Sequence, residues 1–195
     1  MLTFEPVAHE YQWHGKPVPG ITRLMEPIHS YDGVPDWVLE RKADLGKAVH
    51  LACELFDADD LVEESLDERT AGYFEGWKKF RRERGGAVLV SESQMYHPTM
   101  GYAGTPDRAM EVDTPCDVVE IKTTATLFDA VGIQVAAQKE LMIANGKCNR
   151  NSKRFAVQLK PNGTYTMREF KDSSDYPVFV SLLTIHNWKT RHAGH

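Results

Sequence analysis

The sequence of 195 residues contains little cysteine and no long hydrophobic run. Its three cysteines, Cys53, Cys116 and Cys148, are far apart and odd in number, which argues against a disulfide framework and against a four-thiolate zinc or iron–sulfur site. No apolar stretch approaches the roughly 20 residues that a membrane-spanning helix needs. The opening residues, MLTFEPVAHEY, lack the basic and apolar parts of a secretory signal. We therefore expect free, mostly buried thiols, no membrane association and a cytoplasmic location.

An excess of positive charge is lacking too. The formal net charge is −5, whereas domains that bind nucleic acid usually carry a basic surface. This difference excludes little, because a site can gather carboxylates that metal ions neutralise, and positive charge needs only to be local. The sequence has no G-x-x-x-x-G-K-[ST] motif, so we expect no built-in nucleotide-driven motor.

No internal repeat, low-complexity tract or linker-like stretch divides the chain, so we predict a single domain over residues 1–195. Residues 1–86 are expected to form an N-terminal β-hairpin and helices, and residues 87–195 a sheet with further helices. The β-prone stretches are AVLVSESQMY, GTPDRAMEV, DVVEIKTT, RFAVQLK and TYTMREF, and LFDAVGIQVAAQKELMIANG between them reads as one long helix. This order predicts an α/β fold (α+β-like) with a central mixed sheet of about five strands flanked by helices.

Charged and apolar side chains alternate in the stretch VVEIK. On a β-strand, Glu120 and Lys122 share one face, while Val119 and Ile121 share the other. The two apolar side chains are expected to point into the core. The carboxylate and the ammonium then lie side by side on the opposite face.

Asp107 joins this pair if the preceding strand forms an antiparallel hairpin with VVEIK. A turn centred on Thr114 and Pro115 places residue 107 opposite residue 122. Antiparallel partners lie on the same face, so Asp107, Glu120 and Lys122 are expected roughly 5–8 Å apart. A slip by one residue breaks this arrangement, but it also moves the apolar side chains off the core face.

Two carboxylates and one ammonium on one face allow two interpretations, and spacing alone favours neither. One is a solvated face with a cross-strand salt bridge worth about 0.5 kcal/mol. The other is a site for Mg²⁺ or Mn²⁺, with oxygens from Asp107, Glu120 and the backbone carbonyl of Ile121. A bound metal lowers the pKa of water, and Lys122 could orient or help deprotonate that water and stabilise the phosphorane-like transition state.

Pro106-Asp107, followed across the hairpin by Glu120-Ile121-Lys122, resembles the PD-(D/E)XK nuclease superfamily, most of all the branch with the RecB nuclease domain and the lambda-type phage exonucleases. Gly46-Lys-Ala-Val-His50 resembles the upstream helical motif of that branch, in which a histidine is often a metal ligand. Gln134-Val-Ala-Ala-Gln138 resembles its Q-x-x-x-Y helix, with Gln138 in place of the tyrosine, and PVPGIT resembles the opening of phage members. The order and spacing of these motifs carry the resemblance.

The resemblance implies a restriction-endonuclease-like core, with the catalytic sheet in residues 87–195. It also implies Mg²⁺- or Mn²⁺-dependent hydrolysis of DNA that leaves 5′-phosphate and 3′-hydroxyl ends. An exonuclease of phage-type recombination, DNA repair or DNA processing is expected, in the host cytoplasm if phage-encoded. Besides DNA, its partners would be a recombination or annealing protein, or further copies of the chain. The implied catalytic set is Asp107, Glu120, Lys122 and Gln134, and the implied metal ligands are His50, Asp107, Glu120 and the Ile121 carbonyl.

Other residues are candidates for supporting this centre. Glu54 lies one helical turn after His50, Glu92 precedes the hairpin, and Gln138 shares a helix face with Gln134. Glu54 could hold His50 or bind metal through water, and Glu92 could support the site or bind a second metal ion. The Gln138 amide could orient a phosphate or the attacking water. For each residue a plain surface role is the alternative. The DNA-binding candidates are Lys78, Lys79, Arg81, Arg82 and Arg84 in one basic run, with Arg108, Thr123 and Thr124 beside the catalytic strands.

Three other functions stay open. An endonuclease for restriction or for branched DNA would use the same fold and the same residues. A catalytically idle DNA-binding or assembly module is the second, and the intact Asp, Glu and Lys set argues against it. RNA is a third possible substrate, because nothing in the sequence bears on the 2′-hydroxyl.

Overall fold

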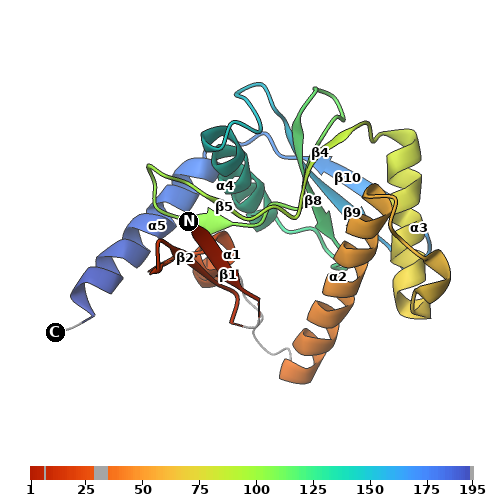
Figure 1. The fold of residues 1–195 in the computed structure, drawn as a ribbon, viewed down its shortest axis with the longest axis horizontal. Helices are drawn as coiled ribbons and strands as arrows, with labels where there is room; N and C mark the ends of the chain where they lie inside the picture. The colour runs from red at the N-terminus through yellow and green to blue at the C-terminus, as the bar shows by residue number, and fades with distance from the viewer. Residues whose placement is uncertain (7, 29–34, 194–195) are drawn as a thin grey trace.

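The computed structural model describes residues 1–6, 8–28 and 35–193, and Figure 1 shows its helices packed around a central sheet. The elements are β1 (Leu2–Glu5), β2 (Glu10–Trp13), β3 (Lys16–Val18), α1 (Ile21–Met25), η1 (Glu26–Ile28), α2 (Asp36–Asp57), η2 (Glu63–Ser65), α3 (Glu68–Glu83), β4 (Val88–Ser91), β5 (Met95–Tyr96), β6 (Ala103–Gly104), β7 (Arg108–Met110), β8 (Asp117–Lys122), α4 (Ala130–Ala144), β9 (Arg154–Leu159), β10 (Tyr165–Glu169) and α5 (Asp175–His192).

The central sheet has five strands in the order β10-β9-β8-β7-β4. Strands β8 and β9 pair in parallel, and the other neighbours pair antiparallel. A parallel pair needs a crossover connection, which α4 provides between β8 and β9. The predicted α/β fold, with a mixed sheet of about five strands flanked by helices, is therefore confirmed.

Alternate residues of β8 pack against different helices. Val118 belongs to a core cluster with residues of α4 and α5. Val119 and Ile121 belong to a second cluster, with residues of α2 and α3. The sheet thus lies between two helical layers, as Figure 1 shows. The alternation predicted for VVEIK is confirmed, and Glu120 points to the side of α4.

The register of the β7–β8 hairpin differs from the predicted one by two residues. Arg108 pairs with Val119 and Met110 with Asp117, which brings residue 107 beside residue 120 and not residue 122. A shift of two residues leaves every side chain on its expected face. Asp107 therefore stays on the face of Glu120, although its predicted cross-strand partner was wrong.

The side chain of Asp117 accounts for this register. Its carboxylate accepts hydrogen bonds from the backbone N–H groups of Asp113 and Thr114, at 2.8 Å each, and from the Thr114 hydroxyl at 2.5 Å. These bonds close the turn around Asp113 and Thr114, one residue earlier than the expected Thr114–Pro115 turn. The same carboxylate accepts from Lys153 N at 2.7 Å and so joins the hairpin to the start of β9.

The N-terminal strands form a separate antiparallel sheet, β1-β2-β3. The β2–β3 hairpin turns at His14 and Gly15, whose φ angles of 52° and 75° suit a tight two-residue loop. This is the predicted turn. A bridge between Gly20 and Ala103 joins the end of this unit to β6.

The stretch 87–96, expected as one strand, forms two. Strand β4 ends at Ser91, and Glu92 adopts a positive φ of 42°, which turns the chain before β5 begins at Met95. A positive φ is uncommon for a residue other than glycine and often marks a functional site.

The expectation of free, mostly buried thiols is met. Cys53, Cys116 and Cys148 are all free, with the first two buried and the third half-buried. Within the described ranges, no helix combines the length and the apolar character that crossing a membrane requires.

Candidate active site

A cleft of about 620 Å³ lies between α2 on one side and the N-terminal sheet with α1 on the other. Residues of β8 and α4 line it as well. Its lining contains every residue that the sequence motifs assign to the catalytic set. The lining residues are His9, Tyr11, Ile21, Thr22, Met25, Ala43, Gly46, Lys47, His50, Leu51, Glu54, Glu92, Gly104, Thr105, Asp107, Glu120, Lys122, Gln134 and Gln138.

The structure brings Asp107, Glu120 and Lys122 together on one face of the sheet. Glu120 is 2% exposed, and its Oε1 accepts a hydrogen bond from Lys122 Nζ at 2.7 Å. Asp107 is 6% exposed, and its Oδ2 accepts from the backbone N–H of Ile121 at 2.7 Å. The Asp107 carboxylate therefore bonds to β8 between the two charged side chains of the trio.

Helix α4 holds Glu120 with two amides. Gln134 Nε2 donates to Glu120 Oε1 at 2.7 Å, and Gln138 Nε2 donates to Oε2 at 2.7 Å. Gln134 Oε1 also accepts from Lys122 Nζ at 3.0 Å. The spacing of four residues places both amides on one helix face, as the motif predicts. Gln138, whose role the sequence left open, is 3% exposed and contacts Glu120 directly.

His50 on α2 faces Glu120 and Asp107 from the other wall. Its Nε2 lies 3.1 Å from the carbonyl oxygen of Ile121, and its Nδ1 lies 3.3 Å from Glu92 Oε1 and 3.6 Å from Asp107 Oδ1. Ligand atoms of His50, Glu92 and Asp107 all lie within 4.8 Å of one another. We call these three residues the metal group.

The metal group changes the expected ligand set in one position. Glu92, for which the sequence left a supporting role or a second-metal role open, belongs to it together with His50 and Asp107. Glu120 instead directs its oxygens to Lys122 and to the two glutamines of α4. The turn at Glu92, with its positive φ, brings that carboxylate to His50. The assignment of Glu120 as a metal ligand stays a prediction.

Burial and charge shift the pKa values of these groups in different directions. Burial, together with the nearby Glu120 carboxylate, raises the pKa of Asp107 well above its usual range. Burial alone would lower the pKa of His50, but Asp107 and Glu92 raise it to about 9. Burial alone would raise the pKa of Glu120, but the Lys122 ammonium holds it below its usual value.

The donor atoms fit a divalent cation. Glu92 and Asp107 offer two carboxylates, His50 an imidazole and Ile121 a backbone carbonyl. Carboxylate and carbonyl oxygens suit Mg²⁺ and Mn²⁺, and an imidazole among them favours Mn²⁺.

Arg108 corrects a DNA-binding expectation. The sequence placed it beside the catalytic strands as a contact for the cleaved strand, but its side chain is completely buried. It forms ion pairs with Asp57, at 2.8 Å, and with Glu92, at 3.2 Å. A buried, paired guanidinium is not available to a phosphate.

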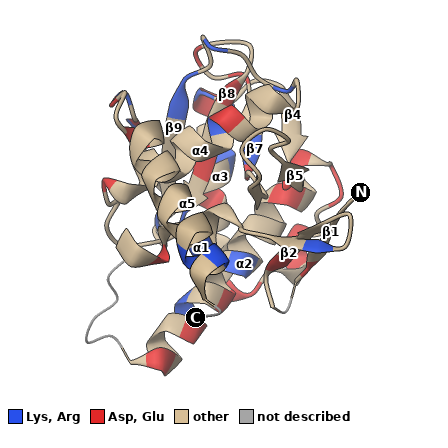
Figure 2. Ribbon diagram, turned by 90° about the vertical axis from the view of Figure 1, so that its left-hand side faces the viewer, with Lys and Arg blue, Asp and Glu red and all other residues tan. Residues whose placement is uncertain are grey.

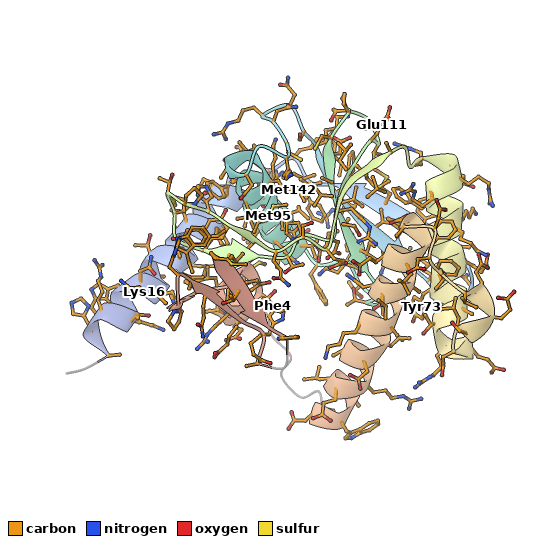
Figure 3. The ribbon with its side chains drawn as sticks, in the orientation of Figure 1. Phe4, Lys16, Tyr73, Met95, Glu111 and Met142 are labelled. Atoms are coloured by element: carbon orange, nitrogen blue, oxygen red, sulfur yellow. The ribbon has the colours of Figure 1, made fainter. Side chains whose placement is uncertain are left out.

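The basic run of α3 does not line the cleft. Lys78 pairs with Glu63 and Glu75, Arg81 with Asp57, and Arg84 with Asp113. Figure 3 shows Phe4 of the N-terminal sheet and Tyr73 of α3 on opposite sides of α2, so α3 lies behind the cleft wall. The expectation that Lys78, Lys79, Arg81, Arg82 and Arg84 contact DNA beside the catalytic residues is not supported.

Thr123 and Thr124 follow β8 without lining the cleft. Thr123 is half-buried and lies near Gly46, and Thr124 is exposed. Their predicted contact with DNA stays a prediction. Glu54 does line the cleft, one turn after His50.

Lys47 is the basic side chain of the cleft wall that the predictions missed. It is exposed on α2, three residues before His50, so both project from the same helix face. Figure 2 shows basic segments on α1 and α2. The spacing of Lys47 and His50 within the motif Gly46–His50 was enough to predict that they share a helix face. Tyr11 and Thr105 form a side-chain hydrogen bond of 2.7 Å in the cleft. They are far apart in the sequence, so no motif predicted that they meet.

The sequence matches no family model and no curated protein. Among solved structures, an alkaline exonuclease from Laribacter hongkongensis is similar to the chain at a TM-score of 0.36 and 15% sequence identity, over 89% of this chain and 92% of that chain. A likeness this weak establishes neither a family nor an activity. Membership of the PD-(D/E)XK superfamily therefore stays a prediction, and the functional proposal depends on the cleft itself and on the motifs.

Proposed function

We propose that this chain is a divalent-metal-dependent nuclease that hydrolyses phosphodiester bonds of DNA. One observation carries the proposal: Asp107, Glu120 and Lys122 meet in a cleft beside His50 and Glu92. A plain salt bridge accounts for Glu120 and Lys122 alone. It does not account for three buried or half-buried carboxylates facing one imidazole, since burying like charges together is unfavourable.

His50, Glu92 and Asp107 would hold the cation, with the Ile121 carbonyl beside them. When bound, a divalent cation lowers the pKa of water and neutralises charge that builds on a phosphate. Lys122 Nζ, held between Glu120 Oε1 and Gln134 Oε1, can orient the attacking water and stabilise the negative charge of the transition state. Water adds to phosphorus, the bond to the 3′-oxygen breaks, and that oxygen takes up a proton. The products are 5′-phosphate and 3′-hydroxyl ends.

Exonucleolytic action is the finer part of the proposal, and the resemblance to phage exonucleases supports it. A chain end is needed in that mode, so a covalently closed circle is not a substrate. Linear and closed circular DNA of the same sequence therefore distinguish an exonuclease from an endonuclease. Single-stranded DNA and RNA of that sequence establish which strand and which sugar the cleft accepts.

The direct experiment compares the wild-type chain with Lys122→Ala, and with Lys147→Ala as the matched control. Lys147 is an exposed lysine that does not line the cleft. With Mn²⁺ or Mg²⁺, the wild-type and Lys147→Ala chains should degrade linear DNA and leave closed circles intact. Lys122→Ala should bind DNA without cleaving it. Cleavage at the wild-type rate by Lys122→Ala contradicts the mechanism. If the wild-type chain binds DNA without cutting it, the chain is a catalytically idle DNA-binding module.

A further inference from the structure

Arg108 makes contacts that reach the whole metal group. It follows Asp107 in the chain, and its side chain is completely buried. Its Nη1 donates to Glu92 Oε1 at 3.2 Å and to the backbone carbonyl of Asp107 at 2.7 Å. Its Nε donates to Asp57 Oδ2 at 2.8 Å. One guanidinium therefore touches two residues of the metal group and one residue of α2.

The third partner, Asp57, connects Arg108 to the histidine of the metal group. Asp57 is the last residue of α2, two helical turns after His50 on the same helix. The three residues of the metal group, His50, Glu92 and Asp107, come from three separate segments of the chain. Arg108 bonds to each of these segments, so it fixes their relative positions.

Asp57 is itself held from the side of α3. Its Oδ1 accepts from Arg81 Nη1 at 2.9 Å and from Trp77 Nε1 at 3.2 Å, and its side chain is 2% exposed. The Arg108 guanidinium lies 5.7 Å from the centre of the Trp77 ring. These contacts allow the guanidinium little freedom, because its fork geometry requires its partners at fixed directions.

Stability alone does not explain a charge network in this place. Buried ion pairs stabilise a fold little compared with apolar side chains of similar size, because both charges lose their hydration. Trp77, whose ring lies close to the guanidinium, belongs to an apolar core cluster with Val49 and Cys53. Glu92, at a φ of 42°, also needs neighbours that hold it in an uncommon backbone conformation. Its N–H donates to the Asp107 carbonyl at 3.0 Å, the same oxygen that Arg108 contacts.

We propose that Arg108 is a positioning residue for the metal group: through Asp57, Glu92 and the Asp107 carbonyl it sets the geometry in which a divalent cation binds. This role depends on the metal binding that the proposed function requires. It does not depend on cleavage of DNA. Lysine at this position keeps the charge, but a point charge does not reach three acceptors in fixed directions.

The experiment measures the affinity of the full chain for Mn²⁺ by electron paramagnetic resonance of the free ion, without DNA. Arg108→Lys should bind Mn²⁺ about 10-fold to 100-fold more weakly than the wild-type chain, the usual loss when a residue that orients metal ligands is replaced. The matched control is Arg154→Lys, in a half-buried ion pair with Asp175 at 2.8 Å, outside the cleft. Its Mn²⁺ affinity should equal that of the wild-type chain.

A second comparison separates positioning from a general loss of order. In a Glu92→Gln background, Arg108→Lys should cause a smaller further loss of Mn²⁺ affinity than it does alone, because the two residues act through the same contact. Fully additive losses, an unchanged affinity of Arg108→Lys, or an equal loss in Arg154→Lys each overturn the inference. If Arg108→Lys does not fold, Asp57→Asn replaces it with the same expected and contrary results. A wild-type chain that binds Mn²⁺ without cleaving DNA contradicts the nuclease proposal alone.

Discussion

Lys122 Nζ and Gln134 Nε2 both donate to the same oxygen of Glu120, Oε1, and Gln134 Oε1 accepts from Lys122 in return. The three side chains form a closed set of hydrogen bonds between β8 and α4. The Lys122 ammonium is therefore held in a fixed position. Pre-organised donors of this kind stabilise a developing charge without reorganisation, which is what phosphoryl transfer requires.

Gln134→Ala should lower kcat by about 10-fold to 100-fold while leaving KM for DNA nearly unchanged, because it frees Lys122 without removing a charge. Steady-state kinetics on a labelled linear duplex measures both constants. Gln94→Ala is the control, since Gln94 is exposed and outside the cleft lining. A rise in KM at constant kcat indicates instead that Gln134 binds the substrate and does not orient Lys122.

Gln138→Leu should destabilise the chain by about 1–3 kcal/mol, because it removes a donor from a buried carboxylate and leaves one oxygen of Glu120 with fewer bonds. The same loss should raise the pKa of Glu120, since the Gln138 amide is among the groups that lower it. Urea unfolding in a chelator gives the change in free energy of unfolding. Gln94→Leu should change that free energy by less than about 0.5 kcal/mol. A Gln138→Leu chain as stable as wild type would show that the amide bond to Glu120 contributes nothing.

The metal-free chain should become less stable as the pH rises from about 5 to about 9. Asp107 holds its proton more tightly in the folded chain than in the unfolded chain, so its ionisation disfavours folding as the pH rises. The pKa of His50 is raised to about 9, so its contribution is complete below about 6.5 and is lost as the pH passes 9. Both groups change stability in the same direction.

Divalent metal should offset this loss. Metal ligands bind in their deprotonated form, so the increase in Tm on adding Mg²⁺ should be larger at about pH 8.5 than at about pH 6. Thermal unfolding followed by circular dichroism, with and without a chelator, measures both effects. An increase in Tm that does not vary with pH contradicts metal binding at Asp107 and His50.

Lys47→Ala should weaken DNA binding and reduce the slope of log K against log salt concentration by about 1, as the loss of one phosphate contact does. Lys78→Ala is the comparison, because Lys78 lies on α3 and pairs with Glu63 and Glu75. Its binding and its salt dependence should match the wild-type chain. If Lys78→Ala weakens DNA binding and Lys47→Ala does not, the basic run of α3 is the DNA contact. Fluorescence anisotropy over a range of salt concentrations distinguishes the two.

Strand alternation made the shared face of Asp107, Glu120 and Lys122 predictable, because successive side chains of a strand point to opposite faces of the sheet. The register was not predictable, since it depends on the bonds that Asp117 makes to the turn. A shift of two residues preserves parity, so the error did not reach the site. Helical spacing likewise placed Gln134 and Gln138 together.

The sequence did not predict the ion pairs of charged residues whose partners are distant in the chain. Arg108 was expected to be available to DNA, but it pairs with Asp57, which lies 51 residues earlier in the chain. The basic run likewise pairs mostly with acids outside α3. The sequence could not place Glu92 more closely, because its position beside His50 depends on a single backbone conformation. Sequence periodicity predicts which face of a strand or helix a side chain occupies. It contains no information about ion pairs between distant residues.

Asp107→Asn tests the central claim most directly, because it changes one atom and removes the buried charge that a cation would neutralise. An amide oxygen can still accept from the Ile121 N–H, so the fold is retained. Cleavage of linear DNA in Mn²⁺ and Tm in a chelator at about pH 8.5 are measured on the same preparation. The metal-site account predicts that cleavage is abolished while Tm is equal to or higher than that of the wild-type chain. Cleavage at the wild-type rate by Asp107→Asn would contradict it.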